Sequence, residues 1–68
     1  MEKRFYVADA GYVGLVSAVC WARKGEFVSV YDKDRARCKT IASGKAPFFE
    51  PNLDQLLSEL LRVGRLEV

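Results

Sequence analysis

The feature of this sequence that most constrains its fold is a glycine-containing turn between a short β-prone run and a long apolar segment. The β-prone run is Phe5–Ala8, and Gly11 and Gly14 follow it closely. The apolar segment Tyr12–Ala22 has helical length and is followed by basic residues and Gly25, as is common where a helix ends. A strand that passes through a glycine turn into a helix is typical of the start of a βαβ unit.

The next part of the chain repeats the change from strand to helix. Phe27–Tyr31 is aromatic and β-branched, which predicts a strand buried inside a parallel sheet and ending at Asp32. A second helix is expected to begin after Asp34, whose side chain is suited to cap it, and to run to Ser43. Its inward face is predicted to hold Cys38, Ile41 and Ala42, and its outer side Lys33, Arg35, Arg37 and Lys39.

A loop with both prolines leads to a third helix and a last short strand. Lys45–Pro51 is this loop, and Asn52 with Gln55 then resembles a capping box. Five leucines recur at helical spacing and predict an inward face: Leu53, Leu56, Leu57, Leu60 and Leu61. Arg65–Val68 alternates like the beginning of a strand. The predicted order is β-α-β-α-α-β, which indicates an α/β fold with a Rossmann-type parallel sheet and a right-handed crossover.

Composition and charge exclude several classes of function. The 11 basic and 9 acidic residues are spread along the chain, without the dense basic stripe that nucleic-acid binding needs. The chain has no histidine and only two cysteines, Cys20 and Cys38, so a zinc site would lack ligands and we expect no metal. Both cysteines are expected to be reduced and buried in a cytoplasmic protein.

The apolar start of the chain resembles a signal peptide on first inspection. Glu2, Lys3 and Arg4 precede a largely apolar run that ends at Ala22. Polar and glycine residues interrupt this run, and it falls short of the roughly 20 unbroken apolar residues of a membrane-spanning helix. We therefore expect neither a signal peptide nor a membrane segment.

The chemistry suggested by the glycine turn is dinucleotide binding. Gly11 and Gly14 occupy the second and third positions of a G-x-G-x-x-G pattern at the start of a helix, where free N–H groups favour phosphate. Asp32 follows Gly14 by 18 residues, at a strand end where an acid binds ribose hydroxyls and favours NAD over NADP. Two structural alternatives stay open at this point, a glycine pair needed only for packing and an aspartate that only caps a helix.

The length of the chain limits what it can bury. With 68 residues it is at most one small domain, and such a domain buries only about 60% of the surface that its unfolded chain exposes. The helix predicted at Tyr12–Ala22 is apolar on nearly all sides and has to be covered nearly all round, which the other residues are too few to do. We therefore expect residues 1–68 to be the N-terminal part of a dinucleotide-binding domain, a single truncated domain with an incomplete sheet.

Several separated segments match one known family. Gly11–Leu15 reads GYVGL, Gly44–Leu53 matches G-x-x-P-x-x-E-P-G-L except at one position, and Gly64–Leu66 closes the match. Asp32 and Arg37 stand where that family has its ribose-binding acid and a basic residue beside the adenosine. In these segments the chain resembles the N-terminal region of the UDP-glucose/GDP-mannose dehydrogenase family.

The resemblance implies a cofactor and a reaction. The cofactor is NAD, and the residues implied to bind it are Ala10, Gly11, Tyr12, Val13, Gly14, Asp32 and Arg37. The implied reaction oxidises UDP-glucose to UDP-glucuronate in two NAD-dependent steps through a thioester on a cysteine. In the family that cysteine lies in a later region, so no catalytic residue is assigned here. The partners implied are NAD, a UDP-sugar that contacts other regions, and further copies of a homo-oligomeric parent enzyme.

Two residues depart from the family pattern. Asp9 replaces the first fingerprint glycine, which places a Cβ in a tight turn and a negative charge near the expected pyrophosphate. Asn52 replaces the glycine of the second motif, a milder change because asparagine tolerates left-handed backbone. Asp9 favours an alternative interpretation, a degenerate Rossmann remnant that no longer binds nucleotide. A dehydrogenase acting on hydroxy acids is a further alternative, disfavoured by the Gly44–Leu53 match.

Overall fold

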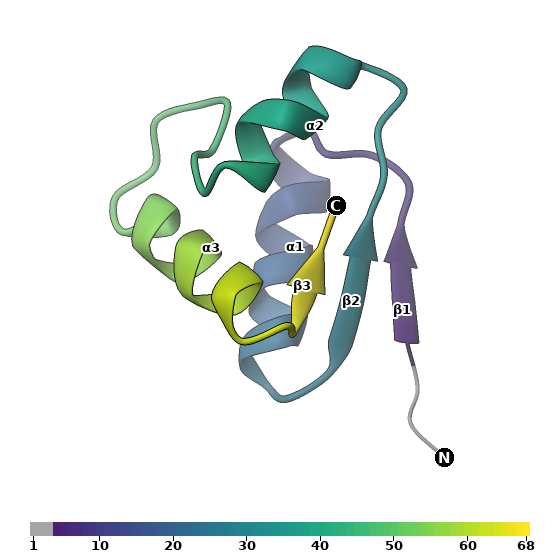
Figure 1. Ribbon diagram of the computed structural model, residues 1–68, viewed down its shortest axis with the longest axis vertical. Helices are drawn as coiled ribbons and strands as arrows, with labels where there is room; N and C mark the ends of the chain where they lie inside the picture. Colours follow the sequence, from purple (N-terminus) through teal and green to yellow (C-terminus); the bar gives the residue numbers. More distant parts are fainter. Residues whose placement is uncertain (1–3) are drawn as a thin grey trace.

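Three parallel strands and three helices follow one another in the predicted order (Figure 1). The computed structural model describes residues 4–68. Its elements are β1 (Arg4–Val7), α1 (Tyr12–Arg23), β2 (Phe27–Val30), α2 (Arg35–Ala42), α3 (Leu53–Arg62) and β3 (Leu66–Glu67). The α/β class and the β-α-β-α-α-β order are thereby confirmed. Of the charged residues considered at the start of the chain, Glu2 and Lys3 lie outside the described residues.

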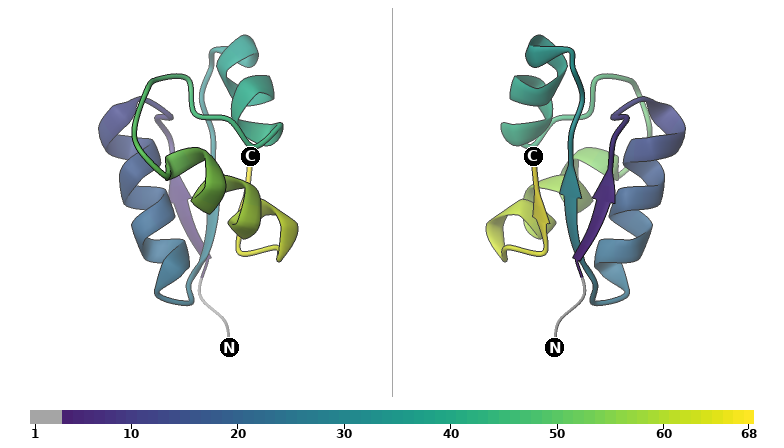
Figure 2. Two further views of the ribbon diagram at one scale, coloured as in Figure 1. Left: turned by 90° about the vertical axis from the view of Figure 1, so that its left-hand side faces the viewer. Right: turned by 90° about the vertical axis from the view of Figure 1, so that its right-hand side faces the viewer.

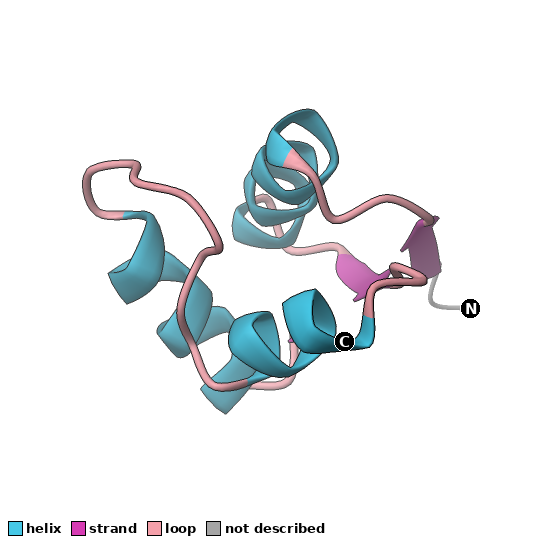
Figure 3. Ribbon diagram, turned by 90° about the horizontal axis from the view of Figure 1, so that it is seen from above, coloured by secondary structure: helices cyan, strands magenta, loops and turns pink. Residues whose placement is uncertain are grey.

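The sheet places the carboxyl ends of its strands at one edge. The strand order is β1-β2-β3, and both pairs are parallel, with Phe5 opposite Val28 and Val28 opposite Leu66. The crossover through α1 is right-handed, and α2 lies beyond the carboxyl ends of the strands (Figures 1 and 2). Seen from above, the loop between α2 and α3 lies at the end of the molecule away from β1 (Figure 3). This topology brings the β1–α1 turn and the end of β2 together.

The hydrophobic core lies between one face of the sheet and the helices α1 and α3. Helix α1 contributes a stripe at helical spacing that faces the sheet, consisting of Leu15, Ala18, Val19 and Ala22. The sheet and the other helices complete the core with Val28, Val30, Ile41, Leu53, Leu57, Leu60 and Leu66. Leu56 and Leu61 are half-buried against it, which confirms the leucine stripe predicted for α3.

The other face of the sheet is polar, although β2 is the central strand of a parallel sheet as predicted. Ser29 lies in the middle of β2 and its hydroxyl accepts a hydrogen bond from Arg4 at 3.1 Å and donates one to Glu67 at 2.9 Å. Arg4 also forms an ion pair with Glu67. Tyr6 is 77% exposed on this face. The alternation follows because α1 and α3 cover one face of the sheet, and the other meets water.

Two residues that were expected to be buried are exposed. Cys20 and Ala42 both point away from the core, whereas Cys38 is half-buried and donates to the carbonyl of Asp32 at 3.1 Å. Cys20 follows Val19 on α1, and adjacent helical residues point in directions about 100° apart, so only one of the two can face the sheet. The apolar character of the segment therefore did not determine which side chains are covered.

The start of α3 differs from the predicted capping box. Asn52 adopts a left-handed conformation with φ 66°, and its side chain makes no capping hydrogen bond. The carboxylate of Asp54 instead accepts the N–H of Ala46 at 2.8 Å and anchors the preceding loop. A left-handed Asn52 turns the chain sharply into the helix, so its side chain is not directed at the N–H groups of the first turn.

Candidate dinucleotide site

The candidate site lies at the carboxyl ends of β1 and β2. The N–H of Tyr31 donates to the carbonyl of Val7 at 2.7 Å and holds the two strand ends side by side. The chain then turns through Asp9 and the buried Ala10 into α1. Ligands of open α/β sheets bind outside the carboxyl ends of the strands, so the predicted residues lie at the edge where such a ligand is expected.

Asp32 joins the end of β2 to the glycine turn. Its Oδ2 accepts the backbone N–H of Ala10 at 2.9 Å, and its Oδ1 accepts the N–H of Asp34 at 2.8 Å. The side chain is only 10% exposed. A carboxylate in this position is fixed by two backbone donors from different segments, and Oδ1 keeps a lone pair for a further donor such as a ribose hydroxyl.

The charge of Asp32 is stabilised by the same contacts. Hydrogen bonds from the N–H groups of Asp34 and Ala10 lower the pKa of Asp32 below its ordinary value of 3.8, partial burial opposes this shift, and the guanidinium of Arg37 adds to it. Asp32 is therefore ionised at neutral pH and acts there as an acceptor. An ionised carboxylate attracts hydroxyl donors and repels a phosphate at the same place.

Arg37 is directed back toward Asp32 and not outward as predicted. Asp34 caps α2 by accepting the N–H of Arg37 at 3.1 Å, which fixes the first turn of the helix. The guanidinium of Arg37 reaches Oδ2 of Asp32 at 3.3 Å and is 37% exposed. The opposite charge of Asp32 draws Arg37 away from the exposed side of α2. Ala10, Asp32 and Arg37, three of the predicted cofactor residues, thus lie together.

Gly14 is required by close packing of α1 against the turn. A Cβ at this position would lie 1.8 Å from the carbonyl oxygen of Asp9 and 3.3 Å from a methyl carbon of Val7. Both neighbours belong to β1 or to the turn that follows it, and the nearer one is backbone. Gly14 therefore allows the start of α1 to lie against the end of β1, which is the packing role of the third fingerprint glycine.

Tyr12 and Val13 lie in the first turn of α1, but Tyr12 is directed at the loop between α2 and α3. Its hydroxyl donates to Oε2 of Glu50 at 3.1 Å, and its ring lies 5.1 Å from that of Phe48. The hydrogen bond and the negative charge of Glu50 raise the pKa of Tyr12 above 10.0. Val13 is 76% exposed. Glu50 and Phe48 were not predicted as neighbours of the site, although both lie in the second segment that matches the family.

The residues present fit one half of a dinucleotide better than the other. The ribose half fits, because Asp32 is ionised and retains acceptor capacity. At the phosphate half, the first-turn N–H groups of α1 have no partners within the helix, and the first turn contains no acidic residue. However, Asp9 occupies the approach to this turn, and its Oδ1 accepts the N–H of Gly11 at 2.8 Å. The phosphate half is thus obstructed by the chain itself.

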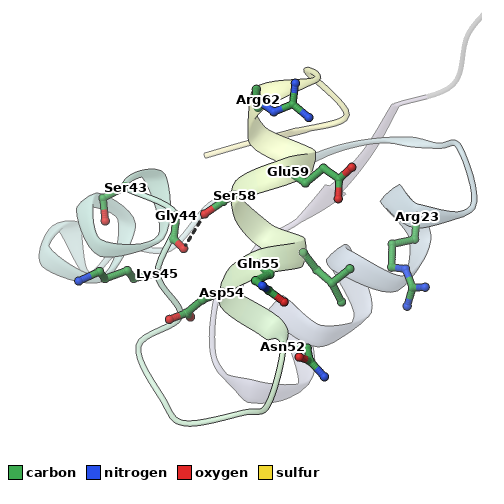
Figure 4. Close-up of a pocket in the computed structure, with 11 residues that line it drawn as sticks. Arg23, Ser43, Gly44, Lys45, Asn52, Asp54, Gln55, Ser58, Glu59 and Arg62 are labelled. Carbon is green, nitrogen blue, oxygen red and sulfur yellow. Dashed lines mark hydrogen bonds between the residues drawn. The ribbon is translucent and has the colours of Figure 1, made fainter.

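A broad surface depression of the described residues lies away from the glycine turn. It has a volume of about 1050 Å³ and runs along α3, bounded by Gly44 and Ser58 and by polar side chains from Arg23 to Arg62 (Figure 4). Gly44 has φ 92° and a Cβ there would meet the hydroxyl of Ser58 at 2.4 Å, so the close contact in Figure 4 requires glycine. No residue of the glycine turn lines this depression.

The described part of the chain has neither a membrane-spanning helix nor a cluster of metal ligands. Within residues 4–68 no helix has the length and apolar character needed to span a membrane. The same residues contain no group of three or more potential ligands that could hold a metal ion.

Comparison with known proteins identifies relatives of this chain. Residues 3–68 match the model of the UDP-glucose/GDP-mannose dehydrogenase family, NAD binding domain. A UDP-glucose 6-dehydrogenase from Rhizobium meliloti is 47% identical over 57 residues, which are 84% of this chain and 13% of that protein. A GDP-mannose 6-dehydrogenase from Azotobacter vinelandii is 40% identical over 63 residues, or 93% of this chain and 14% of that protein.

Solved structures agree with the sequence matches. A UDP-glucose dehydrogenase from Pyrobaculum islandicum superposes with a TM-score of 0.91 and 33% identity, over 98% of this chain and 16% of that one. The chain thus spans about a seventh of the length of the curated relatives it matches. Because the family model covers nearly the whole chain, the chain belongs to the UDP-glucose/GDP-mannose dehydrogenase family and matches its NAD-binding domain.

Proposed function

We propose that this chain is the part of an NAD-binding domain that holds the adenosine ribose of NAD. The observation that carries the proposal is Asp32, an ionised carboxylate fixed at the end of β2 by the N–H groups of Ala10 and Asp34. Ala10, Gly11 and the first turn of α1, including Val13 and Gly14, form the adjacent side of the site, toward the phosphates.

The carboxylate of Asp32 also favours NAD over NADP as the cofactor. A 2′-phosphate would have to lie beside the negative charge of Asp32, which disfavours it. Arg37 is the nearby cation, and its guanidinium is already paired with Oδ2 of Asp32 at 3.3 Å. Because this pairing neutralises part of its charge, Arg37 lowers the preference for NAD without reversing it.

The reaction proposed for the parent enzyme is the oxidation of UDP-glucose to UDP-glucuronate. NAD supplies the hydride acceptor when bound, and this chain contributes residues that hold and orient it. UDP-glucose is favoured as substrate by the several UDP-glucose dehydrogenases among the relatives, although GDP-mannose dehydrogenases are also similar. A homo-oligomeric parent enzyme in the cytoplasm completes the proposal, and the free thiols of Cys20 and Cys38 suit that compartment.

Binding of NAD and NADP to the chain tests the cofactor part of the proposal. Asp32→Asn keeps the size of the side chain and removes its charge, and we expect it to weaken NAD binding by about 10- to 100-fold, as for loss of a charge-assisted hydrogen bond. Glu67→Gln, on the open face of the sheet, is the matched control and should leave binding unchanged. Equal NAD affinity of the native chain and of Asp32→Asn, measured by calorimetry, would contradict the proposal.

Activity of the product of the complete reading frame tests the substrate part. Reduction of NAD is followed with UDP-glucose, GDP-mannose and UDP-N-acetylmannosamine supplied in turn. The proposal expects turnover with UDP-glucose and two molecules of NAD reduced for each sugar oxidised. Turnover confined to either of the other two sugar nucleotides would refute UDP-glucose and leave the cofactor site as proposed.

A second candidate function is favoured by one specific observation. The carboxylate of Asp9 lies at the phosphate half of the site and is bonded to Gly11. A chain in which this contact abolishes cofactor binding would be a non-catalytic remnant of a dehydrogenase. Detectable binding of adenosine together with a total absence of NAD binding at millimolar concentration would support this second candidate.

A further inference from the structure

The phosphate half of the site contains a feature that a fingerprint glycine would not provide, the side chain of Asp9. This residue is exposed and lies in the turn between β1 and α1. Within residues 4–68, Asn52 is the non-glycine residue with positive φ, so Asp9 occupies its position without left-handed strain. The Cβ that Asp9 places in this turn therefore requires no left-handed backbone.

The carboxylate of Asp9 lies beside the space that Gly11 leaves open. If Gly11 carried a Cβ, the three atoms nearest to it would all belong to this carboxylate. Oδ1 would lie at 3.1 Å, Cγ at 3.9 Å and Oδ2 at 4.0 Å. In the fingerprint, this glycine is small so that a pyrophosphate can approach the backbone. Here the approach is taken by a side chain of the chain itself.

The contact of Asp9 is also electrostatic. Its Oδ1 accepts the N–H of Gly11 at 2.8 Å, at the positive end of α1, as a phosphate oxygen would. Within the described residues the ion pairs join Arg4 to Glu67 and Arg37 to Asp32, and neither includes Asp9. A bound pyrophosphate would therefore lie beside a negative charge that no side-chain cation neutralises, and would compete with it for the same donors.

We propose that Asp9 acts as an internal substitute for a phosphate group and selectively weakens binding of the pyrophosphate of NAD, while the adenosine subsite at Asp32 stays intact. This inference rests on the proposed function, because it concerns the same cofactor site. It makes Asp9 the residue that sets cofactor affinity in this chain. The ligands affected are those that carry a diphosphate, and ligands that lack phosphate are unaffected.

Binding of two probes to three forms of the chain tests the proposal. The probes are NAD and adenosine, and the forms are the native chain, Asp9→Gly and Asp9→Asn. We expect Asp9→Gly to bind NAD about 10- to 100-fold more tightly, as follows from removing a like charge beside the pyrophosphate. Asp9→Asn keeps the size and removes the charge, so it should improve NAD binding by a smaller factor. Adenosine should bind all three forms equally.

The outcomes separate this inference from the proposed function. Equal NAD affinity in all three forms, with adenosine bound, would overturn the inference and leave the ribose subsite standing. A parallel rise in affinity for both probes would also overturn it, because the effect would then not be specific to phosphate. Absence of adenosine and NAD binding in every form would overturn the proposed function itself. If Asp9→Gly fails to fold, Asp9→Asn decides the question alone, since unchanged NAD affinity in this neutral isostere refutes the inference.

Discussion

Replacement of Gly14 by alanine provides a quantitative test of how α1 is seated on the sheet. In most exposed helical positions the change from glycine to alanine stabilises a helix, by about 1 kcal/mol. At Gly14 the new Cβ would lie 1.8 Å from the carbonyl oxygen of Asp9, where an ordinary contact is about 3.5 Å. The neighbour is backbone, so relief requires α1 to move away from the end of β1.

The expected net effect is a loss of stability. Overpacking of this kind typically costs about 1 to 3 kcal/mol, and a backbone neighbour places Gly14→Ala near the upper end. After subtraction of the gain in helix propensity, we expect destabilisation by about 2 kcal/mol. This is a large part of what a single small core supplies, about 3 to 5 kcal/mol.

Urea unfolding followed by circular dichroism measures this effect. The matched control is the pair Ser17→Gly and Ser17→Ala, at an exposed position one turn further along α1. There alanine should be the more stable variant by about 1 kcal/mol, the propensity difference alone. The change from glycine to alanine should therefore alter the stability in opposite directions at the two positions. A Gly14→Ala chain as stable as the native one, or more stable, would refute the packing of α1 described above.

Three further predictions concern the core and two titrating groups. Leu57→Ala removes a fully buried side chain of α3 and should cost about 2 to 5 kcal/mol in urea unfolding, whereas Ser58→Ala, its exposed neighbour, should cost less. The pKa of Asp32 is lowered by folding, so its contribution is present above pH 3.8 and is lost as the pH falls through the lowered value. In Asp32→Asn the urea midpoint of unfolding should therefore fall less steeply as the pH is lowered. An equally steep fall would contradict the hydrogen bonds from the N–H groups of Ala10 and Asp34 to Asp32. Glu50→Gln should lower the pKa of Tyr12 toward 10.0, as followed by its ring resonances in NMR, and an unchanged pKa would mean that the two side chains do not meet in solution.

The order of elements could be predicted from the sequence because each boundary has a local cause. Asp34 caps α2 as expected, and the leucines of α3 point inward at the expected spacing. Gly14 was expected to serve close packing, and its contact with Asp9 bears this out. Such features depend on residues near one another in the chain, where spacing and side-chain chemistry are sufficient to determine the outcome.

Features that depend on how distant segments of the chain pack against one another could not be predicted from local patterns. Cys20 is apolar and lies in an apolar helix, but its direction relative to the sheet leaves it exposed. Arg37 was expected on the outer side of α2 and turns back because Asp32 attracts it. The contact of Tyr12 with Glu50 joins residues 38 positions apart, which no local pattern encodes. These three outcomes depend on tertiary packing and charge.

The central claim is that the carboxyl ends of β1 and β2 bind NAD, and amide NMR of the isotopically labelled chain tests it most directly. NAD is titrated to millimolar concentration, which reveals weak as well as tight binding. We expect shifts of the Ala10, Gly11 and Asp34 amides, which surround the carboxylates of Asp9 and Asp32. Shifts confined to the depression along α3, or no shifts at all, would contradict it.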